Sequence, residues 1–275
     1  MTVDTRSDLA SPATVPGSTS PAESVDGPGT TGVHRAEGPA GLPRTDHLPA
    51  PRRGLLRILR GPGRAVVGAL WDVRVHGAEQ VPAEGPVILA ANHIATLDGP
   101  LAVLMSPRRP TYALAKQELF RGMMGGALSR SGQIPIDRDV VVDRTAVDRC
   151  IRVLRDGSAL VVFPEGMRDT GDFAWIRSGA SYLAMVTGAP IVPVAMLGTR
   201  AAGDSPHSTP RLRSRMHVVF GAPLAVRQVP WPRLQAVVRS AAEELRVQLA
   251  AHVRQATELT GTPLPGIPRG RIVPA

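Results

Sequence analysis

The sequence predicts an α/β fold in which a mainly parallel central sheet is covered by helices, as a single domain with a disordered N-terminal tail. Short continuous apolar runs alternate along the chain with helical patterns, and Gly and Pro residues separate them. Such runs are typical of parallel strands that are buried on both faces. Polar residues that can do chemistry follow several of these runs directly. The carboxyl edge of an open parallel sheet is where such residues are expected to gather.

Composition limits the protein classes that need to be considered. A chain of 275 residues is long enough for one catalytic domain with extensions. Its 32 Lys and Arg against 23 Asp and Glu give a net charge of +9, which favours phosphates, anionic lipid or nucleic acid as partners. The single cysteine, Cys150, excludes an internal disulfide and a cysteine metal cluster. No run approaches the roughly 18 apolar residues of a spanning helix, so we expect no integral membrane protein.

The two ends of the chain differ in composition from its centre. Residues 1–51 are rich in Pro, Gly, Ser, Thr and Ala, and residues 260–275 in Pro and Gly. Segments with so few large apolar residues cannot bury enough surface to offset the entropy of ordering, so we expect a disordered N-terminal tail and a flexible C-terminal tail.

Residues 52–71 form a basic apolar segment, with an expected break at Gly61-Pro62-Gly63. Short basic amphipathic segments lie well at an anionic bilayer surface, with arginines on phosphates and leucines among acyl chains. An ordinary first helix that packs on the domain is the open alternative. In the membrane interpretation the contacts come from Arg52, Arg53, Arg57 and Arg60.

Residues 72–259 are expected to form the catalytic domain. Strands are predicted at 73–76, 86–90, 110–115, 159–163, 189–196 and 216–220, and helices at 100–105, 119–128, 147–154, 178–187 and 234–249. In the third helix Val147, Cys150, Ile151 and Leu154 recur with helical spacing, and Gly157 is placed to end it. Cys150 is therefore expected in the core and not as a nucleophile.

His93 and Asp98 lie five positions apart, directly after the apolar run 87–90. Five residues of helix turn through about 500°, so a turn must bring the two side chains together. Gly99 and Pro100 suit such a turn, and Pro100 suits the first position of a following helix. A carboxylate there can orient the imidazole and leave its second nitrogen free to take a proton. A core histidine beside a helix-capping aspartate is the open alternative.

Five further residues lie at or just beyond the carboxyl ends of predicted strands. Arg138 is suited to two-pronged binding of a phosphate, and Lys116 adds positive charge at the same edge. Glu165 is expected to face the cleft, next to Gly166, where the backbone can approach a ligand, and Arg168 follows. A surface salt bridge at Arg138 and a plain turn at Glu165 are the alternatives.

Four segments, in order and at sensible spacing, carry a family resemblance over about residues 70 to 220. They are Asn92-His93 to Asp98, Gly132 to Arg138, Phe163 to Arg168, and Gly188 to Pro193. Together they resemble the motifs of the glycerolipid acyltransferases typified by lysophosphatidate (1-acylglycerol-3-phosphate) acyltransferase. Ala95, Met167 and Asp169 depart from the pattern, because the family often has hydroxyl residues there, and this concerns acceptor contacts.

The resemblance implies acyl transfer from acyl-CoA or acyl-carrier protein to the free hydroxyl of a lysophospholipid, most directly 1-acylglycerol-3-phosphate to phosphatidic acid. It implies His93 as base, the second and third motifs as the grip on the acceptor's phosphate, and an anionic membrane surface as partner. Neither a cofactor nor a metal is called for. We expect a cytoplasmic enzyme, peripheral on the inner face of the cell membrane.

Three alternatives to this function stay open. One is a related acyltransferase with another lysolipid or a glycolipid as acceptor, and another is a lipid-binding protein that has lost catalysis. Nucleic-acid binding is disfavoured, because the few aromatic residues do not interleave with a basic stripe.

Overall fold

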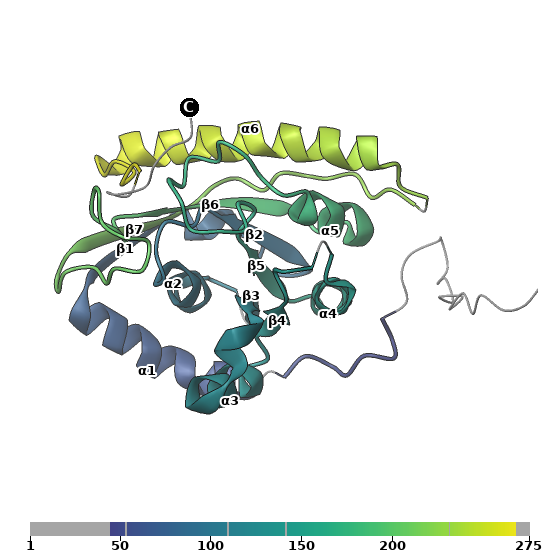
Figure 1. The fold of residues 1–275 in the computed structure, drawn as a ribbon, viewed down its shortest axis with the longest axis horizontal. Coiled ribbons are helices and arrows are strands. Elements are labelled where there is room, and N and C mark those ends of the chain that lie inside the picture. The colour runs from purple at the N-terminus through teal and green to yellow at the C-terminus, as the bar shows by residue number, and fades with distance from the viewer. Residues whose placement is uncertain (1–44, 53, 109, 141, 231, 268–275) are drawn as a thin grey trace, which may run out of the picture. The chain divides into compact units, whose positions relative to one another are not determined.

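The fold is built on a seven-stranded sheet, in the order β1-β7-β6-β2-β5-β3-β4 (Figure 1). The computed structural model describes residues 45–267 except 53, 109, 141 and 231. Most of the two predicted tails, 1–44 and 268–275, lies outside the described residues. The strands are β1 (Asp72–His76), β2 (Val87–Ala91), β3 (Thr111–Lys116), β4 (Ile134–Ile136), β5 (Ala159–Val162), β6 (Ile191–Leu197) and β7 (Arg215–Phe220).

The predicted mainly parallel sheet is confirmed. Strands β6, β2, β5, β3 and β4 pair in parallel with their neighbours, and only β7 pairs antiparallel, with β6. Strand β1 pairs in parallel with β7, so it runs opposite to the other five. The carboxyl ends of β2 to β6 consequently meet at one edge, where ligand sites of open parallel sheets lie.

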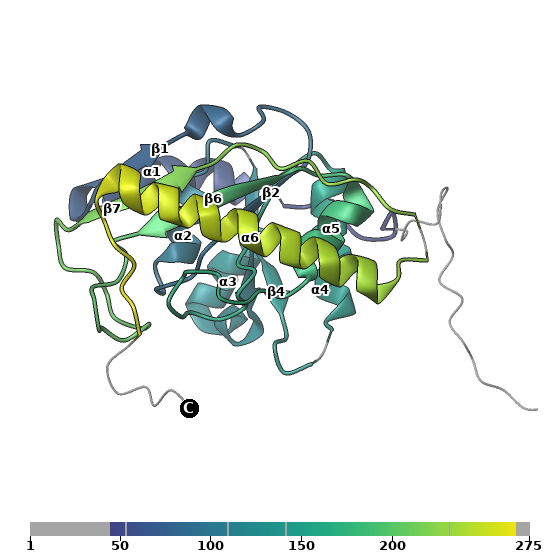
Figure 2. The same ribbon diagram turned by 90° about the horizontal axis from the view of Figure 1, so that it is seen from above.

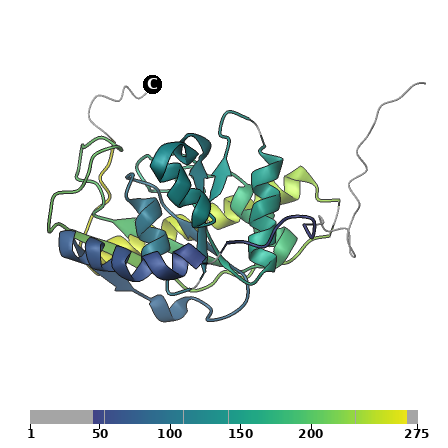
Figure 3. The same cartoon turned by 90° about the horizontal axis from the view of Figure 1, so that it is seen from below.

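Successive residues of each strand face opposite sides, and this alternation builds two cores. Ile88 and Ala90 of β2 pack toward α4 (Arg144–Arg155), α5 (Gly179–Thr187) and α6 (Gln235–Thr260). Val87 and Leu89 pack toward α1 (Gly54–Leu70) and α2 (Asp98–Met105). Figure 2 shows α6 laid along its face of the sheet, and Figure 3 looks onto the opposite side, with α1 in blue. Cys150 of α4 is buried in the first core, as predicted.

The remaining elements are short. They are the 3₁₀ turns η2 (Ala78–Gln80) and η3 (Gln117–Phe120) and the helix α3 (Gly122–Arg130). The sequence predicted one helix over 119–128, whereas the chain forms η3 and then α3, which the extended residue Arg121 separates.

The break predicted at Gly61-Pro62-Gly63 is wrong, because α1 runs through it as one helix. An interior proline costs a helix about 3 kcal/mol, so tertiary contacts must offset it. Gly63 supplies one, since a Cβ there would lie 2.9 Å from the side chain of Leu104 in α2. The missing side chain lets α1 lie close against α2.

Arg60 supplies a second contact and corrects another expectation. Its side chain is buried, with Nε 3.1 Å from the carbonyl oxygen of Leu104 and Nη1 2.8 Å from that of Arg108. Arg60 therefore ties α1 to the C-terminal end of α2 and cannot reach a membrane surface. For this residue the packed-helix interpretation holds.

The described parts of both predicted tails make contacts with the domain. Thr45 is fully buried, and its hydroxyl accepts a hydrogen bond from Arg155 (3.3 Å). At the other end, the carbonyl oxygen of Gly266 accepts from Arg200 (2.8 Å) and that of Pro265 from the Gly203 N–H (3.3 Å). Residues 45–51 and 261–267 thus belong to the fold. Within the described part of the chain, no helix has both the length and the apolar character to cross a bilayer.

Candidate active site

His93 and Asp98 meet at the carboxyl end of β2, as predicted. The chain turns after Ala91, and Asp98 is the first residue of α2. Nδ1 of His93 lies 3.0 Å from Oδ2 of Asp98. Since an ionised carboxylate only accepts hydrogen bonds, Nδ1 carries the proton and Nε2 has a free lone pair. The imidazole is thereby prepared to act as a base.

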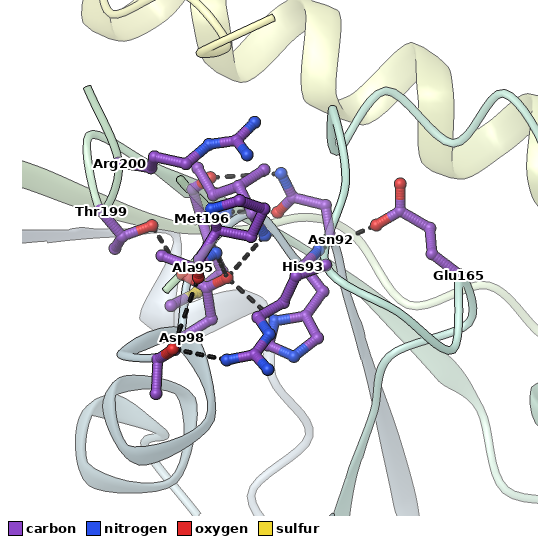
Figure 4. A network of polar contacts seen from close by, with 12 residues as sticks. Asn92, His93, Ala95, Asp98, Glu165, Met196, Thr199 and Arg200 are labelled. Atoms are coloured by element: carbon purple, nitrogen blue, oxygen red, sulfur yellow. Dashed lines mark hydrogen bonds and ion pairs between the residues drawn. The ribbon is translucent and has the colours of Figure 1, made fainter. Parts of the chain in front are cut away.

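Asp98 is fully buried and surrounded by donors (Figure 4). Its Oδ2 also accepts from the backbone N–H groups of Ile94 and Ala95, both at 2.7 Å. Its Oδ1 accepts from the hydroxyl of Thr199 at 2.6 Å. A buried carboxylate needs such donors to replace its lost hydration. Asp98 therefore closes the 94–98 turn and orients His93. The helix-capping alternative is wrong, because the N-cap position of α2 is Leu97 and no side chain among the described residues caps this helix.

Asn92 fixes the backbone from which His93 projects. Its Oδ1 accepts from the N–H of Met196 at 2.6 Å, and its Nδ2 donates to the carbonyl oxygen of Met196 at 3.2 Å. These hydrogen bonds join the end of β2 to β6, and they engage both the oxygen and the nitrogen of the Asn92 side-chain amide. The His93 ring then stacks on Phe163, with the ring centroids 4.1 Å apart. The imidazole is held at its base by Asn92 and on one face by Phe163.

Glu165 does not face the cleft, contrary to the prediction. The residue is 3% exposed, and its Oε2 accepts from the backbone N–H of His93 at 2.8 Å. Burial raises the pKa of Glu165 to about 7, against the opposing effect of hydrogen bonds from the His93 and Phe173 N–H groups. The Glu165 carboxylate thus holds the backbone of His93 through this hydrogen bond.

The loop after β5 passes close to the turn that holds His93. Gly171 has φ 78°, and a Cβ there would lie 2.3 Å from Ile94 and 2.8 Å from Asn92. The N–H of Asp169 also donates to the carbonyl oxygen of His93 at 2.9 Å. Only glycine fits at position 171, and this allows the loop to cover the histidine turn.

A side chain of the protein lies against the backbone of Gly166. This glycine has φ 70°, and a Cβ there would lie 2.6 Å from Nε of Arg177. The close approach is therefore made by the side chain of Arg177. Arg177 was not predicted as a site residue, because it neither follows a predicted strand nor belongs to a periodic pattern in the sequence.

One arginine contacts the histidine turn, and a second lies within electrostatic reach of it and of a third. Arg168 donates to the hydroxyl of Thr96, which lies in the histidine turn. Loss of hydration, and then the charges of Arg168 and Arg177, lower the pKa of Arg138. Lys116, at the end of β3, pairs with Glu118 at 3.3 Å and stays about half exposed. From β2 toward β4, the sheet edge therefore carries the His93 pair first and cationic side chains next.

Comparison with known proteins identifies the fold and the family. Residues 72–197 match the family model described as Acyltransferase. Over this stretch, a little under half of its length, the chain is similar to the acyltransferase family. This stretch contains His93, Asp98, Lys116, Arg138, Glu165, Gly166 and Arg168, so every site residue predicted from the sequence lies within it.

Curated bacterial proteins resemble part of this chain. It is 34% identical over 138 residues to a 1-acyl-sn-glycerol-3-phosphate acyltransferase of Borreliella burgdorferi, covering 48% of this chain and 55% of that one. A protein of the same name from Bacillus subtilis is 29% identical over 58% of this chain and 78% of its own length. The chain therefore spans only about half of the Borreliella relative's length.

A solved structure shares the fold. The crystal structure of a 1-acyl-sn-glycerophosphate acyltransferase from Thermotoga maritima superposes with a TM-score of 0.57, covering 80% of this chain and 81% of that one. The sequence identity is 24%, so this likeness concerns the fold alone.

Proposed function

We propose that this protein transfers a fatty acyl group from acyl-CoA or acyl-carrier protein to the free hydroxyl of a lysophospholipid, with 1-acylglycerol-3-phosphate as acceptor and phosphatidic acid as product. The observation that carries the proposal is the oriented His93–Asp98 pair, at 3.0 Å, on the same sheet edge as Arg138 and Arg168. A base beside a cationic cluster suits a substrate that bears both a hydroxyl and a phosphate. The names of the relatives agree with this acceptor.

The reaction proceeds by direct transfer. Nε2 of His93 takes the proton of the acceptor hydroxyl while its oxygen attacks the thioester carbonyl carbon. The new ester bond forms, the carbon–sulfur bond breaks, and the leaving thiolate takes the proton back from the imidazolium. Asp98 stabilises the imidazolium between these steps. Cys150 is buried in the core and takes no part.

The acceptor's phosphate binds to the arginine cluster. Arg138 and Arg168 were predicted for this role, and Arg177 joins them because its side chain lies against Gly166, next to Glu165. Three guanidinium groups can bind a phosphate through charge-assisted, two-pronged hydrogen bonds. Lys116 adds positive charge farther along the edge, while Glu165 and Gly166 act on the acceptor indirectly, through His93 and Arg177.

A second acceptor class is kept as an alternative because of local sequence. Met167 is 41% exposed beside Arg168, where the related motif often carries a hydroxyl residue. An exposed thioether in place of a hydroxyl removes a hydrogen bond to a polar headgroup and adds apolar contact. Another lysolipid or a glycolipid acceptor, with the same chemistry, is the corresponding alternative. Ala95 is fully buried and does not bear on this choice.

The acceptor lies in a membrane, and α1 offers a surface for peripheral contact. Ile58, Leu59 and Val66 are 70%, 46% and 57% exposed on this helix, which also carries the exposed Arg64. Met123 and Met124 of α3 are 95% and 65% exposed. Exposed apolar side chains next to arginines suit the surface of an anionic bilayer. We propose that the protein acts on the inner face of the cell membrane. Arg60 takes no part in the membrane contact, because its side chain is buried.

Purified protein should be incubated with each acyl donor and a panel of lysolipids and glycolipids, and the products identified by mass spectrometry. Phosphatidic acid formation is expected, and exclusive acylation of another acceptor would select the alternative. His93→Ala should keep the circular dichroism spectrum and lose about 10²–10⁴-fold in turnover, the usual contribution of a general base. Lack of any product with every pair would indicate a lipid-binding protein instead.

A further inference from the structure

We propose that Thr199 is a positioning residue of the reaction, which holds Asp98 in the orientation that His93 requires. This inference rests on the proposed acyl transfer by His93. Thr199 follows β6 and is fully buried, and its Oγ1 lies 2.6 Å from Oδ1 of Asp98 (Figure 4). No prediction from the sequence included Thr199.

The two oxygens of Asp98 have different partners. Oδ2 accepts from His93 and from the two N–H groups of the turn, all within residues 93–98. For Oδ1, the donor among the described residues is Thr199, 101 positions away in sequence. The turn alone therefore orients only one oxygen. The Thr199 hydroxyl fixes the rotation of the carboxylate and with it the direction of Oδ2 toward Nδ1.

Thr199 is itself held firmly. The preceding Gly198 has φ 77°, and a Cβ there would lie 2.5 Å from the carbonyl oxygen of Arg215 in β7, so the turn is pressed against the sheet. The following Arg200 is 3% exposed and donates to the carbonyl oxygens of Asp169 and Gly266, at 2.9 and 2.8 Å. Asp169 in turn donates its N–H to His93. The hydroxyl is therefore placed by the fold and not by local flexibility.

Loss of the Thr199 hydroxyl should change the proton affinity of His93 as well as the stability of the fold. Without its donor, the charge of Asp98 is less neutralised and acts more strongly on His93, which favours the imidazolium. The histidine would then become available as a base only at higher pH. Other charged groups around the pair are Glu165, Arg168, Asp169 and Arg200, and none of them is altered by a substitution at Thr199.

The test compares three variants by kcat, by the KM for lysophosphatidate, by the pH profile of kcat/KM and by Tm. Thr199→Val removes the hydroxyl at nearly constant volume, and Thr199→Ser retains it. Thr111→Val is the matched control, because Thr111 is also a buried threonine, at the start of β3, and its hydroxyl bonds only within residues 106–111 among the described contacts.

Thr199→Val should lose at least about tenfold in kcat, as expected for an unsatisfied buried carboxylate oxygen, with little change in KM. The acid limb of its pH profile should move to higher pH. Thr199→Ser should restore both. Thr111→Val should lower Tm while leaving kcat and the profile as in the wild type.

A normal kcat and pH profile in Thr199→Val would overturn the inference, as would equal kinetic effects of Thr199→Val and Thr111→Val. If Thr199→Val does not fold, Thr199→Cys, with a weaker donor of similar size, should show the same kinetic changes, and normal kinetics there would overturn it as well. His93→Ala is measured alongside. Activity retained by His93→Ala refutes the proposed function, whereas an inactive His93→Ala with normal Thr199 variants refutes only the role of Thr199.

Discussion

At the scale of single residues, the site separates side chains that act from side chains that hold them. In the proposed mechanism His93 acts as the base, and Arg138, Arg168 and Arg177 bind the phosphate of the acceptor. Asn92, Asp98, Glu165 and Thr199 are buried, and their polar atoms are occupied within the protein. Buried polar groups of this kind tolerate little change, because any unpaired atom costs stability.

Glu165 should make the stability of the protein depend on pH. Burial raises its pKa from 4.5 to about 7, so the folded state holds the proton more tightly than the unfolded state does. The resulting stabilisation is fully present below about pH 4.5 and is lost as the pH rises through about 7. Glu165→Gln cannot ionise, so the variant should gain up to about 3 kcal/mol relative to the wild type between pH 5 and pH 8.

Urea unfolding of both proteins at four pH values checks this expectation. Glu258→Gln is the control, since Glu258 is exposed on α6 and should give a difference that does not vary with pH. A flat difference for Glu165→Gln would contradict a raised pKa.

Arg138→Ala should raise the KM for the phosphate-bearing acceptor far more than the KM for the acyl donor. Loss of a charge-assisted hydrogen bond of about 1.5–3 kcal/mol corresponds to roughly 10–100-fold. Arg138→Lys should rescue only in part, because an ammonium group lacks the planar fork. Arg177→Ala should show the same pattern, while Arg254→Ala, exposed on α6, should change neither constant. Equal effects on both substrates would refute a phosphate grip.

At the scale of elements, the position of α1 depends on one buried arginine. The Arg60 side chain donates hydrogen bonds to the carbonyl group of Leu104, at the C-terminal end of α2, and to that of Arg108, just beyond the helix. Gly63 allows α1 to lie in contact with α2. Helix C-terminal carbonyl groups favour a cation. These contacts carry the helix across Pro62.

Arg60→Ala should therefore destabilise the fold by about 2–3 kcal/mol, since it removes the side-chain donor of the Leu104 carbonyl group and one of the two donors of the Arg108 carbonyl group. Arg64→Ala is the matched control one turn later on the same helix, where the side chain is exposed, and should stay within about 0.5 kcal/mol. Denaturant unfolding measures both. Similar values for the two variants would mean that α1 contributes little through Arg60.

At the scale of the described domain, the two sides of the sheet have different surfaces. The side with α1 and α3 exposes Ile58, Val66, Met123 and Met124, and the other side is covered by α6. A protein that works on a bilayer lipid should bind through the first of these sides.

Liposome flotation should show stronger binding to anionic than to neutral vesicles. High salt should weaken the binding without ending it, because salt screens charges beyond about 8 Å but leaves apolar insertion intact. The double variant Ile58→Gln, Val66→Gln should show less flotation and less activity on vesicles, while its activity on a dispersed short-chain acceptor persists. Leu234→Gln is the control, as Leu234 is 68% exposed at the start of α6. Unchanged flotation would place the membrane contact elsewhere.

The sequence by itself determined the α/β class, the parallel strands and the chemistry at their ends. Buried strands are continuous apolar runs, and the polar residues that follow them, such as His93 and Arg168, are visible as interruptions. The 93–98 turn was also predictable, because a helix cannot bring those two side chains together. All of this information is local in the chain.

Only the tertiary structure decided which of these side chains are buried in hydrogen bonds within the protein and which remain exposed. The sequence shows that Glu165 follows a strand, but only the packing of the 163–173 loop turns it toward the His93 N–H. Thr199 and Asp98 are 101 positions apart, and no periodicity relates them. In the same way, the sequence indicates a surface charge at Arg60, and only the packing of α1 against α2 shows that its side chain is buried. Such contacts depend on how separate elements approach one another in space, and for that reason they could not be derived from the pattern of residues along the chain.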